Sequence, residues 1–387
     1  MYKEFVHFVR KLYQTNDFIP LHAPQFRGNE KQYLIDTIDS TFVSSVGVYV
    51  EQFEERVAEY TGAKHTIATV NGTSALHIAL MLAGVEPETE VITQSLTFVA
   101  TCNAIRYCQA DPVFVDVDMD SMGLSPGSLA DFLDKNAELR DDGYCWNKTS
   151  DKKITACLPM HTFGFPVRLD EIAKICQQYH IALVEDAAES LGSYYKEKHT
   201  GILGKTAVIS FNGNKIITTG GGGMVLTNDT EIANRAKHIT TTAKVPHKWA
   251  FEHDEVGYNY RLPNLNAALG VAQMELLPEY LRNKREIAQQ YQEWGQQNGI
   301  EFVKEQTNTK ANYWLNTAIM QDQKQRDKFI EETNSQNVMT RPAWTPMHQL
   351  VINQDCQHSD LSNTKWLYNR VVSVPSSAIF KVRKSEE

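Results

Sequence analysis

The sequence predicts an α/β fold built on a mostly parallel, seven-stranded sheet. Short apolar runs typical of buried strands alternate with segments of helical periodicity from about residue 60 onward. The apolar runs cover residues 66–70, 90–93, 113–117, 154–159, 182–185, 207–211 and 224–227, and clear helical patterns cover 73–82 and 169–179. Strands that alternate with helices form parallel sheets, because each helix returns the chain to the edge where the next strand starts.

The two ends of the chain have a different character. Apolar residues at helical spacing predict an amphipathic helix in an N-terminal arm over residues 1–17, packed on the body or on a partner subunit. Residues 264–297 predict a long helix with a break near Pro278, and short strands follow it. We therefore expect a large domain over 18–270 and a smaller α+β domain over 271–387. Residues 134–152 are polar and predict a surface excursion, and the charged tail at 381–387 predicts a frayed end.

Composition excludes several function classes. The net charge of -9 argues against a general nucleic-acid surface and against attraction to anionic membranes. Six cysteines without CxxC spacing indicate neither a metal site nor a disulfide framework. The sequence shows no secretion signal and no apolar run of membrane-spanning length, so we expect a cytoplasmic location.

Lys215 and Asp186 are the candidate catalytic residues. Lys215 leaves the expected strand at 207–211 just before the glycine run at 220–223, where its amine can be desolvated and made nucleophilic. Asp186 ends the expected strand at 182–185, at the sheet edge where parallel sheets place ligands. A lysine and an aspartate on such strand ends are what a pyridoxal phosphate enzyme needs. In isolation, Lys215 could be a solvated loop residue and Asp186 a helix cap.

A candidate phosphate site follows the first expected strand. Gly72, Thr73 and Ser74 open a helix whose first N–H groups and dipole favour an anion, although, taken alone, the motif is better explained as a plain helix cap. Ser210 can add a hydroxyl donor, and Phe98 can stack on a flat ring or simply lie in the core. Dinucleotide binding is disfavoured, because the glycine run lacks the GxGxxG spacing.

These segments together resemble the DegT/DnrJ/EryC1/StrS family of sugar aminotransferases over residues 18–377. Further similar segments are Met-His-Thr-Phe-Gly at 160–164 and Thr-Pro-Met-His at 345–348. The resemblance implies the aspartate aminotransferase fold, which is fold type I of pyridoxal 5'-phosphate enzymes. It also implies a homodimer with shared active sites.

The resemblance implies a role for each candidate residue. Lys215 would form the Schiff base and Asp186 would pair with the pyridine nitrogen. Glu189 would lie on the side of the ring's phenolic oxygen, and Phe98 would stack on the ring. The phosphate would be held by the residues Gly72, Thr73, Ser74 and Ser210 of one subunit and by Asn259 of the other.

The nearest similarity is to the legionaminic acid branch of the family, through residues 41–47 and 97–101. That branch implies amination at C4 of a UDP-linked 2-acetamido-2,6-dideoxy-4-keto sugar, with glutamate as donor, for nonulosonic acid or surface polysaccharide synthesis. Candidate substrate contacts are His161, Arg341, Trp344 and His348, each of which can equally be structural.

Two alternatives share the fold. A sugar dehydratase of this family would carry histidine in place of Lys215, so the lysine favours amination. A catalytically silent regulator that binds pyridoxal phosphate has no need to keep Lys215, Asp186 and Ser210 together.

Overall fold

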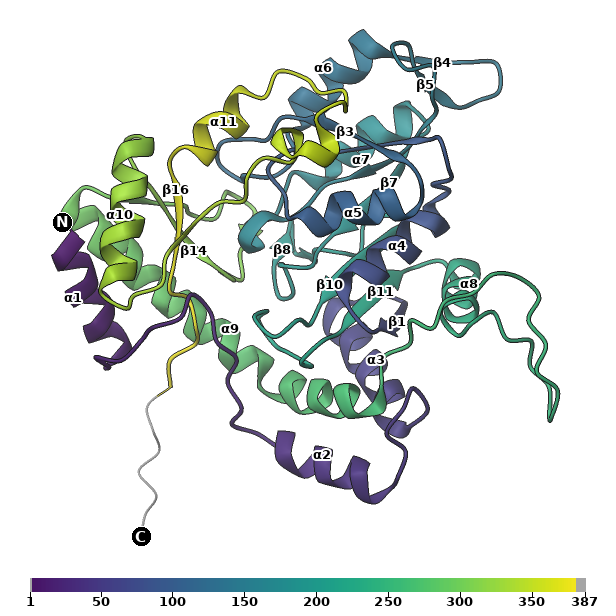
Figure 1. The fold of residues 1–387 in the computed structure, drawn as a ribbon, viewed down its shortest axis with the longest axis horizontal. Helices are drawn as coiled ribbons and strands as arrows, with labels where there is room; N and C mark the ends of the chain where they lie inside the picture. The colour runs from purple at the N-terminus through teal and green to yellow at the C-terminus, as the bar shows by residue number, and fades with distance from the viewer. Residues whose placement is uncertain (1, 381–387) are drawn as a thin grey trace.

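A seven-stranded sheet with helices on both faces dominates the computed structural model, which describes residues 2–380 (Figure 1). The strand order is β1-β11-β10-β7-β6-β2-β3. Strands from β10 to β3 run parallel, and β11 is antiparallel to both of its neighbours. The bounds are β1 His65–Thr69, β2 Glu90–Gln94, β3 Asp111–Val115, β6 Ile154–Leu158, β7 Ala182–Asp186, β10 Thr206–Ser210 and β11 Gly223–Thr227. The predicted mostly parallel sheet is confirmed, with strand positions within two residues of those expected.

The helices form a layer on each face of the sheet because side chains alternate along each strand. Ile209 of β10 packs in one apolar cluster with Phe53 and Val271, whereas its neighbour Val208 packs in another cluster with Ala75. The first face is covered by α3 (Val48–Thr61), α6 (Pro126–Asn136), α7 (Leu169–Gln178) and α9 (Asn264–Asn298). The second face is covered by α4 (Gly72–Ala83), α5 (Val99–Tyr107) and α8 (Thr230–Thr240).

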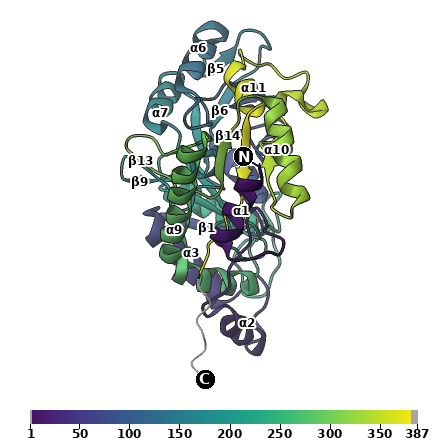
Figure 2. The same ribbon diagram turned by 90° about the vertical axis from the view of Figure 1, so that its left-hand side faces the viewer.

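A smaller sheet in the order β12-β14-β16-β15 follows α9. Its strands are β12 (Glu301–Phe302), β14 (Asn316–Ile319), β16 (Val371–Val374) and β15 (Arg341–Pro342), accompanied by α10 (Gln323–Ser335) and α11 (Ser362–Tyr368). Helix α1 (Tyr2–Tyr13) lies beside α10, and Phe5 contacts the Phe329 ring at 4.8 Å (Figure 2). Helix α2 (Glu30–Asp39) packs on α9.

The structure differs from the sequence expectation at two segments. The predicted break at Pro278 is wrong: α9 continues through it, because Leu277, Tyr280 and Leu281 keep one buried face on both sides of the proline. The polar stretch 134–152 contains a short hairpin of β4 (Ala137–Leu139) and β5 (Cys145–Asn147).

Smaller elements complete the chain. A three-stranded sheet joins β13 (Thr309–Lys310), β8 (Tyr194–Tyr195) and β9 (Lys198–His199) in that order. Single turns form η1 (Thr162–Gly164), η2 (Met347–Gln349) and η3 (Val351–Asn353). The division into an arm and two domains stays a prediction, and its boundary at residue 270 falls inside α9. The tail expected to fray, 381–387, lies outside the described residues. Among the described helices, all are too short or too polar to span a membrane.

Candidate active site

One cavity of about 310 Å³ gathers most of the predicted site residues at the carboxyl ends of the parallel strands. Strand β1 delivers the start of α4, β7 delivers Asp186, and β10 delivers Ser210 and the loop that carries Lys215. The lining includes the predicted residues Gly72, Thr73, Phe98, Asp186, Glu189, Ser210, Lys215 and Trp344. The sheet therefore assembles in space a set that is spread over 270 residues of sequence.

The Lys215 amine is held by an acid and an aromatic ring. Its Nζ lies 3.1 Å from Oε1 of Glu189 and 3.8 Å from the centroid of the Trp314 ring. The Lys215 side chain is 13% exposed, so it is largely withdrawn from water but still faces the cavity. Trp314 also fixes the lysine's loop, because its Nε1 donates to the carbonyl oxygen of Asn214 at 2.7 Å.

Asp186 is a buried carboxylate with two donors. The Thr101 hydroxyl donates to Oδ2 at 2.8 Å, and the Ala188 N–H donates to Oδ1 at 3.2 Å. Burial raises the pKa of Asp186, and the Thr101 hydroxyl and the nearby Lys215 charge oppose that rise. A cation placed against this carboxylate would relieve the cost of burying its charge.

Glu189 is buried as well and connects two elements of the site. Its Oε1 faces Lys215, while Oε2 accepts a hydrogen bond from the Phe163 N–H at 2.9 Å. Burial raises the pKa of Glu189, and the Lys215 charge lowers it. The carboxylate therefore positions Lys215 from a fixed point on the backbone.

The start of α4, where the sequence predicts a phosphate site, lines the cavity through Asn71, Gly72 and Thr73. Asn71 caps the helix, and its side chain accepts the Ser74 N–H at 2.8 Å. The N–H groups of Gly72 and Thr73 remain directed out of the helix end, as the geometry of a first turn requires. A Cβ on Gly72 would lie 3.0 Å from Cβ of Ser210. Glycine at position 72 therefore allows the start of α4 and the end of β10, which would bind the phosphate from two sides, to approach closely.

The structure places the other predicted residues away from this cavity. The Ser74 N–H is already taken by Asn71, and Ser74 does not line the cavity. Asn259 lies on the segment beyond α8, where it pairs with Thr241. Its predicted role in a partner's site stays a prediction.

Of the four candidate substrate contacts, Trp344 alone lines the cavity. His161 as a direct contact is wrong: it is fully buried, accepts the Val167 N–H at Nδ1 and directs Nε2 to Glu185 at 3.3 Å. Arg341 is exposed on β15, and Nδ1 of His348 lies 2.7 Å from the Ser95 hydroxyl. Both lie outside the cavity, so their substrate roles stay predictions.

Sequence reasoning missed Thr101 and Trp314. Thr101 lies in the same segment as Phe98, one helical turn after Thr97. This spacing places the two hydroxyls on the same side of the helix start and could have marked Thr101 as a site residue. Trp314 lies between β13 and β14, about 100 residues after Lys215 and outside the strands of the main sheet, so no local pattern marks it as a site residue.

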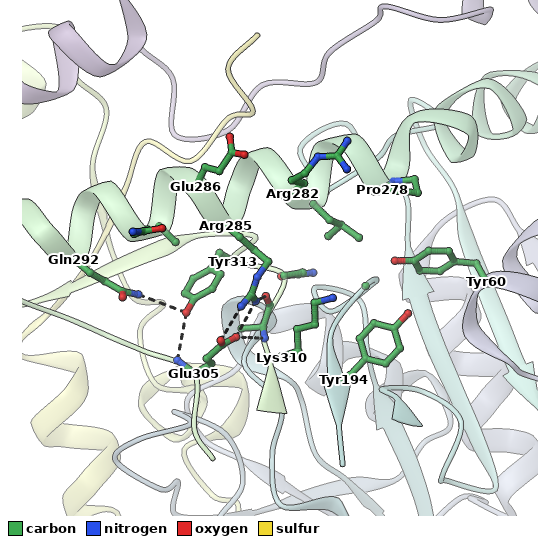
Figure 3. Close-up of a pocket in the computed structure, with 16 residues that line it drawn as sticks. Tyr60, Tyr194, Pro278, Arg282, Arg285, Glu286, Gln292, Glu305, Lys310 and Tyr313 are labelled. Carbon is green, nitrogen blue, oxygen red and sulfur yellow. Dashed lines mark hydrogen bonds and ion pairs between the residues drawn. The ribbon is translucent and has the colours of Figure 1, made fainter. Parts of the chain in front are cut away.

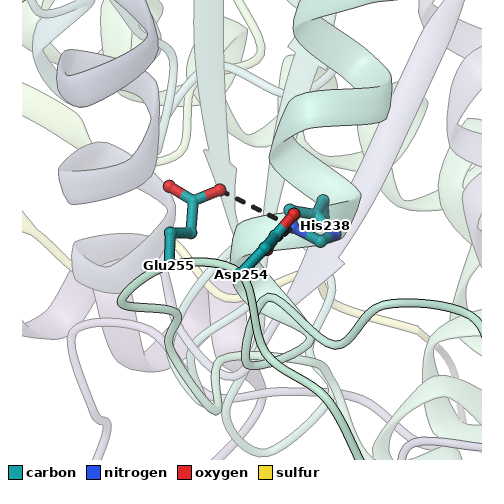
Figure 4. A group of neighbouring side chains, drawn as sticks. All are labelled: His238, Asp254 and Glu255. Carbon is teal, nitrogen blue, oxygen red and sulfur yellow. Dashed lines mark hydrogen bonds and ion pairs between the residues drawn. The ribbon is translucent and has the colours of Figure 1, made fainter.

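A second cluster of titratable groups lies outside the cavity. His238 on α8 places Nε2 2.7 Å from Asp254 and 3.6 Å from Glu255 (Figure 4). Arg235 engages both carboxylate oxygens of Glu255, so this acid already has a cationic partner. The cluster fastens residues 254–255 to the end of α8.

Comparisons with known proteins identify the family of the chain. The model of the DegT/DnrJ/EryC1/StrS aminotransferase family matches residues 24–385. The chain is 34% identical over 365 residues to the putative pyridoxal phosphate-dependent aminotransferase EpsN of Bacillus subtilis, covering 93% of this chain and 91% of that protein. It is 34% identical over 333 residues to GDP-perosamine synthase of Escherichia coli O157:H7, covering 86% of each.

Solved structures share the fold. The aminotransferase TlmJ from Streptoalloteichus hindustanus superposes with a TM-score of 0.83 at 26% identity, covering 93% of each chain. Helicobacter pylori PseC gives a TM-score of 0.83 at 23% identity, covering 93% of this chain and 94% of the other. The family match spans nearly the whole chain and the relatives match over most of their length. The chain belongs to the DegT/DnrJ/EryC1/StrS aminotransferase family.

Proposed function

We propose that this protein is a cytoplasmic aminotransferase that uses pyridoxal 5'-phosphate to move an amino group from glutamate to C4 of a nucleotide-linked 4-keto-6-deoxy sugar. The observation that carries the proposal is the cavity itself. It combines a withdrawn lysine amine, a buried carboxylate and an open helix end within 310 Å³. Each of the three groups matches a different part of the cofactor.

The residues present fit pyridoxal phosphate. Gly72 and Thr73 would bind its phosphate through their N–H groups, with the Ser210 hydroxyl beside them. Asp186 would face the protonated ring nitrogen. The positive charge of that nitrogen would offset the cost of burying the Asp186 carboxylate. Lys215 would hold the cofactor covalently through Nζ.

When bound, the cofactor supplies an electron-withdrawing ring that accepts the charge left when a proton leaves the substrate carbon. The chain's own residues do the rest. Lys215 Nζ takes that proton and returns it to a different atom, acting as general base and then as general acid. Asp186 keeps the ring nitrogen protonated throughout. Glu189 and Trp314 hold the Lys215 amine on one side of the cavity between these steps.

For the sugar, we propose UDP-2-acetamido-2,6-dideoxy-hexos-4-ulose as the substrate, for nonulosonic acid or surface polysaccharide synthesis. The similarity of residues 41–47 and 97–101 to the legionaminic acid branch supports this choice. The relatives named GDP-perosamine synthase make a GDP-linked sugar the competing candidate.

The test is a panel of UDP-, GDP- and dTDP-linked keto sugars assayed with glutamate, with NMR of the product to locate the new amine. We expect kcat/KM to be highest for the UDP-linked 4-keto sugar, with the amine on C4. A preference for the GDP-linked sugar would refute the substrate but keep the aminotransferase. No glutamate consumption with any member, by protein that retains its cofactor, would refute the reaction in favour of a silent regulator.

We also propose that two copies share their active sites. Residues 241–260 extend from the body beyond α8 (Figure 1), and this arm exposes Trp249 by 77% and Phe251 by 81%. Large apolar side chains at such exposure favour a protein contact. Asn259, in the same segment 241–260, does not line the cavity of its own chain. This is expected of a residue that contributes to the active site of a partner subunit.

Mixing two inactive variants tests this sharing. Asn259→Ala and Lys215→Ala subunits, unfolded and refolded together, form mixed dimers in which one of the two sites has both residues intact. Random pairing predicts recovery of about a quarter of wild-type activity. Activity that stays at the level of the separate variants would refute shared sites, whereas the sugar panel would be unaffected.

A further inference from the structure

A second cavity of about 690 Å³ lies between α9 and the small sheet of β13, β8 and β9 (Figure 3). The apolar wall comes from α9, where Leu281 and Pro278 line it. Its volume falls in the range of about 300–1,000 Å³ that is usual for sites of small organic ligands. We call this cavity, lined on its two sides by residues 278–292 and 305–313, the α9 groove.

Three donors converge in the α9 groove. Figure 3 shows the hydroxyls of Tyr60 and Tyr194 and the amine of Lys310 directed into the same space below α9. Burial and the neighbouring Tyr194 phenol raise the pKa of Tyr60. The Tyr60 phenol therefore remains protonated at neutral pH and can donate to an anion.

Three cations, Arg282, Arg285 and Lys310, line the groove together with two acids, Glu286 and Glu305. Glu305 is already engaged by Arg285, through contacts of 2.8 and 2.7 Å, and by the Ala311 N–H at 2.9 Å. Neither Arg282 nor Lys310 forms an ion pair within residues 2–380. An ammonium and two phenols around one space, with a guanidinium at the rim, suit an anion that has several oxygens.

We propose that the α9 groove is a second binding site, which takes a phosphorylated small molecule through Lys310, Tyr60 and Tyr194. The donors would bind the phosphate oxygens, and the Leu281 wall would accept the less polar part of the ligand. Free pyrophosphate and a nucleotide present the same phosphate chemistry, so the test uses both.

The groove and the Lys215 cavity share one wall. Tyr313 lines the groove, and the next residue, Trp314, packs under Lys215. Asn312, which directly precedes Tyr313, is buried; its side chain donates to the Glu189 carbonyl at 2.8 Å and accepts the Trp314 N–H at 2.8 Å. Tyr313 is held at a positive φ of 50°, which is an unfavourable backbone for a bulky residue. Movement of Tyr313 by a ligand is therefore passed to Trp314, and occupancy of the groove changes turnover at Lys215.

Calorimetric titration of the holoenzyme with pyrophosphate, and separately with UDP, tests the site. We expect Lys310→Gln and Tyr194→Phe each to weaken pyrophosphate binding about tenfold, because each removes a donor to a charged oxygen. Lys324→Gln is the matched control, since it removes the same charge from an exposed position on α10. Tighter binding of UDP than of pyrophosphate at the same site identifies a nucleotide as the ligand, and the reverse identifies free phosphates.

Three outcomes would overturn the proposal. The first is that neither probe binds at millimolar concentration, and the second is that both groove variants bind as tightly as the control. Either result removes the site even if the enzyme aminates sugars as proposed. The third concerns the shared wall: pyrophosphate should alter kcat/KM of the wild type and should leave kcat/KM of Lys310→Gln at the value measured for that variant without pyrophosphate. An equal response of both proteins would place the effect at the active site instead.

Discussion

Replacing Thr101 with valine removes the hydroxyl that donates to the Asp186 carboxylate and that also lies 2.9 Å from the Thr97 hydroxyl. Thr101 donates from its hydroxyl to Oδ2 of Asp186 at 2.8 Å, and both residues are buried. Valine has nearly the same shape, so the cavity keeps its volume. The Ala188 N–H at 3.2 Å then remains as the neighbouring donor to the carboxylate.

The size of the effect follows from the charge of the acceptor. A hydrogen bond to a charged group contributes about 1.5–3 kcal/mol, and one pKa unit corresponds to about 1.4 kcal/mol. The pKa of Asp186, which burial already raises and Thr101 lowers, should therefore rise further by about 1–2 units. Cofactor binding needs the charged carboxylate, so affinity falls as the pH drops through this pKa. In Thr101→Val the fall occurs at a higher pH.

Titration of the apoprotein with pyridoxal phosphate across a pH series measures this shift directly. The matched control is Thr93→Val, which also removes a buried hydroxyl of the same sheet, one that donates to the Leu158 carbonyl at 2.7 Å. We expect the control to keep the wild-type pH profile. An unchanged profile in Thr101→Val, or an equal shift in Thr93→Val, would show that Thr101 does not tune Asp186.

Three further predictions concern neighbouring residues. Gly72→Ala should weaken cofactor affinity about tenfold, because its Cβ would lie 3.0 Å from Ser210. Gly127→Ala, at the start of α6, should leave the affinity unchanged. Equal cofactor affinities of the two variants would contradict the phosphate site. Trp314→Phe loses the hydrogen bond to the Asn214 carbonyl, and we expect kcat to fall about tenfold with KM nearly constant. A change in KM alone would instead assign Trp314 to substrate binding. Burial lowers the pKa of Lys284, so below the ordinary lysine pKa the unfolded chain binds a proton that the folded chain does not. The free energy of unfolding therefore rises with pH up to the ordinary lysine pKa. Urea unfolding of Lys284→Met should lack this rise, and a rise that persists in the variant would refute the assignment.

The sequence predicts the sheet and the strand-end residues well, because both depend on local patterns. Apolar runs mark strands, and polar residues directly after them must lie at one edge of a parallel sheet. Asp186 ends β7, Gly72 and Lys215 follow β1 and β10 within five residues, and all three line one cavity.

Residues placed by tertiary packing could not be found in this way. Trp314 reaches Lys215 from a segment about 100 residues away, held by the side-chain hydrogen bonds of Asn312. His161 was a candidate substrate contact, yet its side chain is fully buried and its Nε2 lies 3.3 Å from Glu185 Oε2. Proline usually breaks a helix, but at Pro278 helix α9 continues because the packing of its buried face stabilises it on both sides of the proline.

Reduction of the holoenzyme with borohydride, followed by peptide mass analysis, tests the central claim most directly. The account predicts a yellow protein that loses its colour and carries one cofactor adduct, on Lys215. Lys205 is a useful internal comparison, because it directly precedes β10, ten residues before Lys215, but does not line the cavity. An adduct on Lys205 or on any other lysine, or a colourless protein without an adduct, would contradict the account.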